Sequence, residues 1–221
     1  MTEMNRRELI LANSINCGLP SRFTQVNYIG KDGSNGVAID TGVFATSDIT
    51  IEAKVLLGAT GVYPILSGRK VASPTTGIMI LITNKNLSLM SGTESIKFAG
   101  YDSANPSILK LDNKQFIYNG EIISQQEPTS YNTGVAIRLF VSHQYYAGAD
   151  DYKEDYGYGD ISEKGIRFYW LKIYNKGILV RDYIPCVDSS GVACFYDLVT
   201  QKPYYNYLNG TMLYGTEETD E

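Results

Sequence analysis

The sequence is poor in several residue types on which common classes of protein depend. It has one histidine, one tryptophan and three cysteines among 221 residues, and only 19% of its residues are charged. Serine–histidine, cysteine–histidine and most zinc chemistry would rest on the single histidine, His143. Because His143 follows a predicted strand and precedes Gln144, we expect it in a loop, with a solvated side chain. We therefore predict no catalytic residues.

Charge and hydropathy exclude further classes. The formal net charge of −5 argues against a nucleic-acid partner, because a phosphate backbone requires a basic surface. No apolar run approaches the ~20 residues that cross a membrane. The apolar block 9–12 is shorter than the roughly 7–15 residues of a secretory signal. We expect neither a signal peptide nor a membrane partner.

The three cysteines, Cys17, Cys186 and Cys194, form an odd set without metal-ligand spacing. Cys186 and Cys194 could meet across a hairpin and form a disulfide. The alternative, buried free thiols in a protein that assembles in a reducing cytoplasm, is favoured.

What the sequence does contain is typical of strands and turns. Glycine (21) and tyrosine (18) are abundant, and both suit tight turns and recognition surfaces. Apolar residues alternate over 48–57 and again over 135–141, which predicts two strands with one buried face each. In the second strand the alternation predicts an outward-facing set that consists of Ala136, Arg138, Phe140 and Ser142.

Two hairpins are predicted from turn chemistry. Asn119-Gly120 separates 115–118 from 121–124, and 175–177 separates 166–174 from 178–184, with Gly177 at positive φ. Strands recur at short intervals and no amphipathic helix interrupts them. We therefore predict an all-β fold, a two-sheet antiparallel jelly-roll sandwich over residues 23–215.

The two ends are predicted to lie outside this sandwich. Residues 1–22 form an arm in which 4–15 could be a short helix. The arm either frays or docks onto a neighbouring chain. Its docking residues would be Leu9, Ile10, Leu11 and Ile15. Residues 216–221 form an acidic tail that we expect to be disordered.

Motifs at both ends of the predicted sandwich resemble a known family. They are Ala38-Ile39-Asp40-Thr41-Gly42-Val43 after Val26-Asn27-Tyr28-Ile29, the run 169–186 with Arg181-Asp182-Tyr183-Ile184-Pro185-Cys186, and Tyr196-Asp197-Leu198-Val199. Over about 19–215 the chain resembles the concanavalin A-like (laminin G-like) jelly-roll domain of bacteriophage virion proteins and gut-bacterial surface proteins. The resemblance implies the fold and says little about activity.

The closing motif also has a physical interpretation. Arg181 and Asp182 lie mid-strand, where they must satisfy each other or the backbone. Pro185 should end the strand, and the Asp197 carboxylate should accept a backbone N–H two residues on. We predict structural roles for all of them.

A tyrosine- and acid-rich segment, 143–164, is predicted to be a long loop. Tyrosine rings offer apolar faces and a hydroxyl to a glycan or a protein partner. The candidate binding residues are Tyr145, Tyr146, Tyr152, Tyr156 and Tyr158. The weak Ca²⁺ candidates are Asp150, Asp151, Asp155 and Asp160. They are weak because the segment lacks the Asp-x-Asp-Gly type of spacing of Ca²⁺ loops. The alternative is a flexible loop without a ligand.

Jelly-roll glucanases carry Glu-x-Asp-x-x-Glu on one strand, and no such run occurs here. We therefore predict a non-enzymatic protein without a cofactor. Binding of Ca²⁺ is left open as an alternative. Its predicted role is that of a bacteriophage virion component made in the host cytoplasm, a capsid decoration or a head or tail fibre. It would assemble with other virion proteins and grip host surface polysaccharide. The alternatives are a carbohydrate-binding module at the bacterial cell surface and a glycoside hydrolase-like enzyme.

Overall fold

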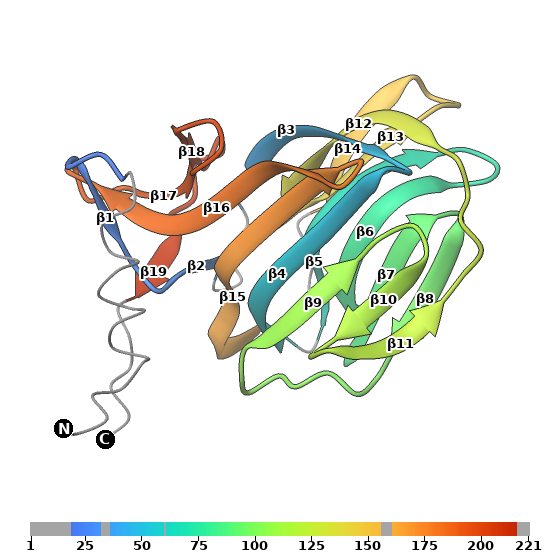
Figure 1. Cartoon of the computed structure of the whole chain (residues 1–221), viewed down its shortest axis with the longest axis horizontal. Coiled ribbons are helices and arrows are strands. Elements are labelled where there is room, and N and C mark those ends of the chain that lie inside the picture. The colour runs from blue at the N-terminus through green and yellow to red at the C-terminus, as the bar shows by residue number, and fades with distance from the viewer. Residues whose placement is uncertain (1–18, 32–35, 60, 156–160, 216–221) are drawn as a thin grey trace.

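The computed structural model describes residues 19–31, 36–59, 61–155 and 161–215, without the side chains of 59, 155 and 161–164. These residues contain strands and turns but no helix. The strands form two sheets that lie face to face (Figure 1). In the described ranges, nothing helical is long and apolar enough to span a bilayer. The predicted all-β sandwich is confirmed.

Sheet A has eleven strands among the described residues. In spatial order its main path is β11 (Glu121–Gln125), β10 (Gln115–Tyr118), β9 (Ser107–Leu111), β4 (Ile49–Ala59), β15 (Ile161–Asn175), β16 (Ile178–Asp188), β17 (Ala193–Asp197) and β18 (Lys202–Tyr205). The remaining strands are β1 (Phe23–Gln25) on β16, β2 (Tyr28–Lys31) on β15, and β19 (Leu213–Gly215) on β2.

Sheet B faces sheet A across the core. Its main path is β14 (Asp151–Asp155), β13 (Ser142–Tyr146), β5 (Val62–Val71), β6 (Thr76–Thr83), β7 (Asn86–Gly92) and β8 (Glu94–Phe98). Off this path, β12 (Asn132–Leu139) pairs with both β5 and β3 (Ile39–Thr46). Within the described ranges every pairing is antiparallel except that of β13 with β5.

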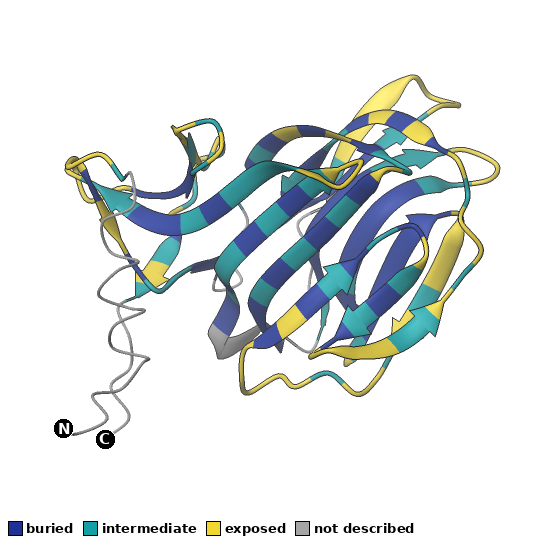
Figure 2. Ribbon diagram, viewed as in Figure 1, coloured by how far each residue is buried: buried dark blue, intermediate teal, exposed yellow. Residues whose placement is uncertain are grey.

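The core follows the alternation read from the sequence. On β4 the inward set is at most 1% exposed, and it consists of Ile49, Ile51, Ala53, Val55 and Leu57. Buried and partly buried residues alternate visibly along β4 and β15 (Figure 2). Phe140 meets Phe168 edge to face at 5.4 Å between ring centroids, so the two sheets interlock there.

Both predicted hairpins are present. Asn119 and Gly120 have φ of 49° and 88°, as a two-residue type I′ turn between β10 and β11 requires. Between β15 and β16, φ of Gly177 is positive, as predicted, at 75°. Lys176 also has a positive φ, of 52°. Turn chemistry therefore sets the two residue pairs next to each turn, and a bulge shifts the register beyond them.

The predicted loop over 143–164 is wrong. Residues 142–155 form the β13–β14 hairpin, and β15 begins at Ile161. The predicted strand over 135–141 also breaks, because Phe140 adopts φ 65° and turns inward, fully buried. This left-handed residue donates its N–H to the Ile65 carbonyl and reverses the chain from β12 into β13. Ser142, predicted to face outward, is buried as well.

In the closing motif one expectation is wrong. Pro185 lies within β16, opposite Phe195, because its carbonyl accepts a bond from Val26 N at 3.0 Å and the strand continues. The predicted bond from Val199 N to the Asp197 carboxylate is present at 3.1 Å.

Cys186 and Cys194 are directly opposite each other on β16 and β17 and are buried free thiols, as favoured. Burial raises the pKa of each thiol to about 12. They pack with Phe23 and Tyr196 in a small cluster that Leu19 covers in part.

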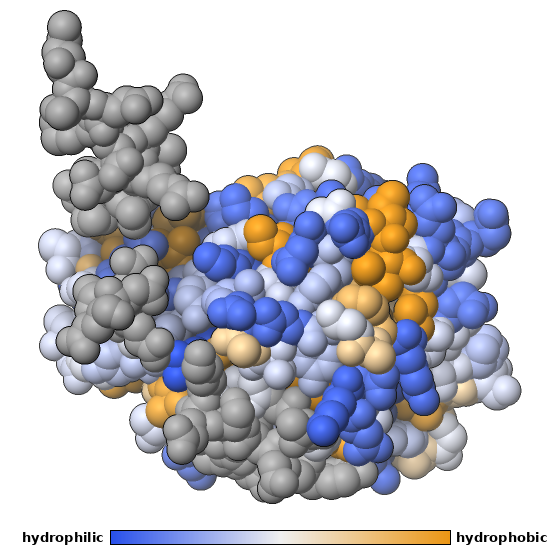
Figure 3. All heavy atoms as spheres, turned by 90° about the horizontal axis from the view of Figure 1, so that it is seen from below, coloured by the Kyte–Doolittle hydropathy of each residue, from blue (hydrophilic) through white to orange (hydrophobic). Residues whose placement is uncertain are grey.

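Cys17, the arm residues Leu9, Ile10, Leu11 and Ile15, and the tail 216–221 lie outside the described residues, so the predicted domain limits remain predictions. The surface seen from below carries separate apolar patches among hydrophilic side chains (Figure 3).

Candidate functional site

A hollow lies on the outer face of sheet B, where β3 and β12 meet the β13–β14 hairpin. Alternation on β3 and β12 turns every second residue away from the core, and three of these outward residues, Gly42, Gly134 and Ala136, have a methyl group or no side chain. The hollow has a volume of about 450 Å³, and it is lined by Asp40, Phe44, Gly134, Ala136, Arg138, His143 and Tyr152.

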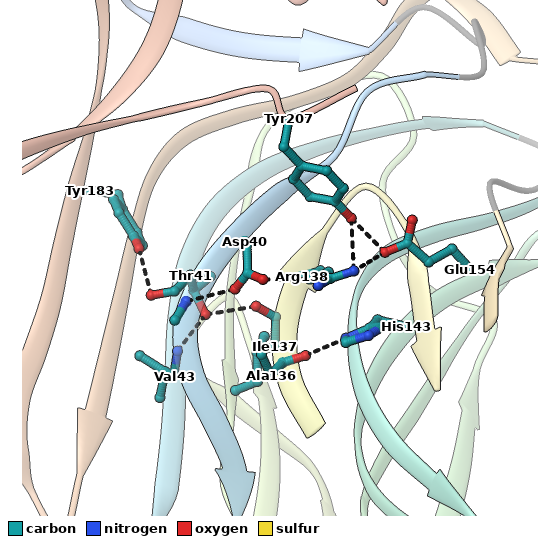
Figure 4. Close-up of polar contacts among 11 residues, drawn as sticks. Asp40, Thr41, Val43, Ala136, Ile137, Arg138, His143, Glu154, Tyr183 and Tyr207 are labelled. Carbon is teal, nitrogen blue, oxygen red and sulfur yellow. Dashed lines mark hydrogen bonds and ion pairs between the residues drawn. The ribbon is translucent and has the colours of Figure 1, made fainter. Parts of the chain in front are cut away.

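Arg138 is the polar centre of this corner (Figure 4). Its Nε donates to Asp40 Oδ2 at 3.1 Å, and its Nη1 donates to the Glu154 carboxylate and to the Tyr207 hydroxyl. Tyr207 in turn donates to Glu154 Oε1 at 2.6 Å. Burial, and then the bond to Glu154, raise the pKa of Tyr207, so its hydroxyl keeps the proton it donates. The four side chains join β12, β3, β14 and the segment after β18.

The floor of the hollow is formed by residues with small side chains. Gly134 has φ 67°, and apart from Gly134 itself and its two chain neighbours nothing lies within 4 Å of the position a Cβ would take there. Its N–H donates to the Asn132 side chain at 3.1 Å, which supports the turn-like backbone. Ala136 is the next outward residue on β12 and carries only a methyl group. The space above these two residues is therefore open to a ligand.

His143 forms part of the wall, and the prediction that it is solvated in a loop is wrong. It lies on β13 and is 3% exposed. Its Nδ1 lies 2.8 Å from the Ala136 carbonyl, which can only accept, so Nδ1 carries the proton and Nε2 is an acceptor. Burial lowers the pKa of His143, the nearby Arg138 charge adding to the effect. The ring stacks on Tyr152 at 5.6 Å with 22° between planes.

Two aromatic rings stand exposed beside the hollow. Phe44 and Tyr152 are each 57% exposed, although large aromatic side chains lose water contact favourably when covered. Tyr152 also contacts Tyr145, with 5.0 Å between ring centroids, and Tyr145 donates its hydroxyl to Asp150.

The hairpin divides the predicted tyrosines. Tyr145 and Tyr152 are cross-strand partners on the face that also holds His143 and Glu154. Tyr146 lies on the opposite face, under the Lys153 ammonium at 5.0 Å. Tyr156 and Tyr158 lie outside the described residues.

The weak Ca²⁺ candidates do not gather in the part of the chain that the structure describes. Asp150 and Asp151 are exposed in or beside the hairpin turn, and Asp150 binds Tyr145. The side chains of Asp155 and Asp160 lie outside the described set. Among described residues no group of three or more histidine, cysteine or acidic side chains is placed to hold a metal ion.

Sequence reasoning missed part of this site. Phe44 gave a usable signal, because it is a large apolar residue in the outward set of an alternating strand. Asp40 lies in the motif 38–43, which indicates the fold and not a binding residue. Tyr207 gave no signal, since it reaches Arg138 from 69 residues away along the chain.

No protein-family model matches the chain, and no curated protein is significantly similar to it. Among solved structures, one similar chain is that of a mutant of HCR/D, with 13% sequence identity and a TM-score of 0.34. The match covers 72% of this chain and 40% of that one, so the chain spans less than half of its length.

Proposed function

We propose that the protein is a non-enzymatic binding module that holds part of a carbohydrate in the hollow between Phe44 and Tyr152. The observation that carries the proposal is the pair of exposed aromatic rings beside an open, small-residue floor with a charged wall. A sugar has apolar C–H faces and a rim of hydroxyls. Aromatic faces contact the former, and the Asp40, His143 and Arg138 side chains bond to the latter.

The alternative is that the Arg138 cluster only fastens the hairpin to the sandwich. Fastening explains the bonds among Arg138, Glu154 and Tyr207. It does not explain why Phe44 and Tyr152 remain more than half exposed. The volume of about 450 Å³ also falls within the roughly 300–1,000 Å³ of small-ligand pockets.

The polar arrangement favours binding without hydrolysis. In glycosidases two carboxyl groups flank the scissile bond, and one of them donates a proton to the leaving group. Here Asp40 and Glu154 both accept from the same Arg138 guanidinium. Release of reducing ends from a polysaccharide would instead establish a glycoside hydrolase.

For the biological setting we propose a concanavalin A-like domain in a bacteriophage virion, with a bacterial surface protein as the alternative. The support is the resemblance carried by the motifs 38–43, 169–186 and 196–199. Asp40 belongs to the first of these motifs and lies in the wall of the hollow.

The test is calorimetric binding of the purified protein to polysaccharides isolated from bacterial surfaces. Tyr152→Ala should weaken binding at least about tenfold, which corresponds to about 1.4 kcal/mol. Ala136→Phe should also weaken it, because the new ring fills the floor. The matched control is Tyr214→Ala, since Tyr214 lies on β19, is 46% exposed and lines a different pocket. Equal loss in Tyr152→Ala and Tyr214→Ala, or no binding to any polymer, would refute the proposal.

A further inference from the structure

The guanidinium of Arg138 keeps unused hydrogen-bond donors at the hollow. Nε donates to Asp40 Oδ2 at 3.1 Å, and Nη1 donates to Glu154 and to the Tyr207 hydroxyl. An arginine has five N–H donors, so the two on Nη2 remain. They bond to none of the described residues. Because Arg138 lines the hollow, Nη2 is the nitrogen that can serve a ligand there.

The direction of these unused donors depends on what holds the other two nitrogens. A guanidinium is planar and its N–H groups form a rigid fork, so bonds at Nε and Nη1 fix Nη2 as well. Asp40, which holds Nε, lines the hollow. Glu154 and Tyr207, which hold Nη1, are not among its lining residues. Arg138 is therefore held by one residue of the wall and by two residues outside it.

Tyr207 connects the cation with its carboxylate partner. Its hydroxyl accepts from Arg138 Nη1 at 3.2 Å and donates to Glu154 Oε1 at 2.6 Å. The guanidinium carbon also lies over the Tyr207 ring, 5.0 Å from its centroid. Figure 4 shows the three side chains together. Tyr207 thus limits the guanidinium both along its Nη1 bond and across its plane.

The backbone of Tyr207 is tied to the chain just before β3, the strand that carries Asp40. Tyr207 N donates to the Ala38 carbonyl at 3.2 Å. The side chain of the preceding Asn206 accepts from Ala38 N and donates to the Gly36 carbonyl, each at 2.8 Å. Ala38 lies two residues before Asp40. Tyr207 and Asp40 therefore share one support and hold the guanidinium from two sides.

Resting on the proposed carbohydrate-binding function, we propose that Arg138 donates from Nη2 to a hydroxyl oxygen of the sugar, and that Tyr207 is the positioning residue for this bond. In a guanidinium the Nε–H and one N–H of Nη2 run parallel. The sugar hydroxyl therefore lies beside the Asp40 carboxylate and donates to it. An unsubstituted hydroxyl suits this place, because it accepts and donates at once.

Tyr207→Phe tests the positioning role, because it removes the hydroxyl and keeps the ring under the guanidinium. Calorimetric titration with the bacterial surface polysaccharide that the wild-type protein binds should show an affinity about fivefold weaker. In an Arg138→Lys background the same substitution should change the affinity less than about twofold, because an ammonium has no Nη2 to position. A merely structural bond from Tyr207 to Glu154 persists in that background and would cost the same factor in both.

Tyr205→Phe is the matched control. Tyr205 is 38% exposed against 43% for Tyr207. It also donates its hydroxyl to a carboxylate, Asp188 Oδ2, at 2.9 Å, and it lines a different pocket. We expect its loss to leave the affinity for the polysaccharide unchanged.

The side-chain ¹⁵N signals of Arg138 report on Nη2 directly. They are assigned by their absence from the spectrum of Arg138→Lys. Oligosaccharides cut from the bound polysaccharide should shift the Nη2 signal more than the Nε signal. A larger shift at Nε, or no shift at either nitrogen, would show that the ligand does not take Nη2.

The outcomes separate the two proposals. If Tyr152→Ala weakens binding, and Tyr207→Phe weakens it equally in both backgrounds or in neither, the hollow binds carbohydrate but Tyr207 does not position Arg138. If no polysaccharide binds, or if Tyr152→Ala has no effect, the carbohydrate-binding function fails and this inference fails with it.

Discussion

Two arginines of this protein pair with carboxylates in opposite surroundings, and neighbouring residues of β3 connect them. Arg138 bonds to the outward Asp40, and Arg181 donates from Nε to the carbonyl of the inward Thr41 at 3.0 Å. Figure 4 shows both residues of β3. Arg181 also lies 3.7 Å from Asp197, which is fully buried. The Arg181 cluster is enclosed, whereas the Arg138 cluster borders a hollow with exposed aromatic rings.

The difference teaches that an arginine–carboxylate pair does not reveal its role by itself. Asp197 accepts bonds from the backbone N–H groups of Asp182, Val199 and Thr200, and from the Thr200 hydroxyl at 2.6 Å. Its bonding capacity is used within the fold. Asp40 retains acceptor capacity and faces open space. The Arg181–Asp197 pair therefore holds parts of the sandwich together, whereas the Arg138–Asp40 pair borders an open hollow.

The largest expected effect is a loss of folding stability when the enclosed Arg181–Asp197 pair is broken. Asp197→Ala should lower the free energy of unfolding by about 3 kcal/mol, because it removes the carboxylate beside the Arg181 charge and leaves several buried backbone donors without their acceptor. Urea denaturation measures the loss. Asp48→Ala is the control, since its pair with Lys176 spans 4.0 Å at the surface and should cost less than about 1 kcal/mol. Similar losses in the two variants would contradict the contrast.

Conservative substitution of the two arginines should separate stability from binding. Arg181→Lys loses the bonds to the Thr41 and Val180 carbonyls and should cost about 2 kcal/mol with polysaccharide affinity unchanged. Arg138→Lys cannot reproduce the forked contacts to Asp40 and Glu154, so we expect weaker binding with a smaller loss of stability. Denaturation and calorimetry on the same two proteins provide the comparison. The opposite pattern would exchange the roles of the two pairs.

The sequence predicted the enclosed region much better than the open one. Alternation and turn residues gave β4, the β10–β11 and β15–β16 hairpins and the local bond at Asp197, because each depends on residues close in sequence. The hollow depends on a left-handed Phe140, which nothing nearby in the sequence requires. That turn forms because Ile65 accepts its N–H and Phe168 receives its ring. Contacts so distant along the chain leave no local pattern.

A smaller effect on folding stability should appear as the pH is lowered, because of His143 at the hollow. The pKa of His143 is lowered by burial, so the unfolded chain binds the proton more readily than the folded protein. Stability that is present above the unfolded pKa of about 6.5 is lost as the pH falls toward the folded value. His143→Gln, which can still donate to Ala136, should reduce this acid sensitivity. Urea midpoints at pH 7.5 and pH 5 measure it; an unchanged difference in the variant would exclude His143 as the cause.

The smallest effect concerns reactivity on the enclosed side. Because Cys186 and Cys194 are buried and burial raises the pKa of each to about 12, neither should react with a thiol reagent in the folded protein. A Cys17→Ser background removes the third thiol. Both remaining thiols should become reactive in urea, with the same midpoint as unfolding. Rapid labelling of the folded protein would show that β16 and β17 are more open than the Arg181 cluster implies.

The central claim, that the open corner binds ligand and the enclosed one does not, is tested most directly by nuclear magnetic resonance. Oligosaccharides from a bound polysaccharide are titrated into ¹⁵N-labelled protein while the backbone amide signals are followed. We predict saturable shifts at Gly134, Ala136 and His143, and none at Asp182 or Thr200. Shifts that cluster around β16–β18, or that avoid β12 and β13, would contradict the account.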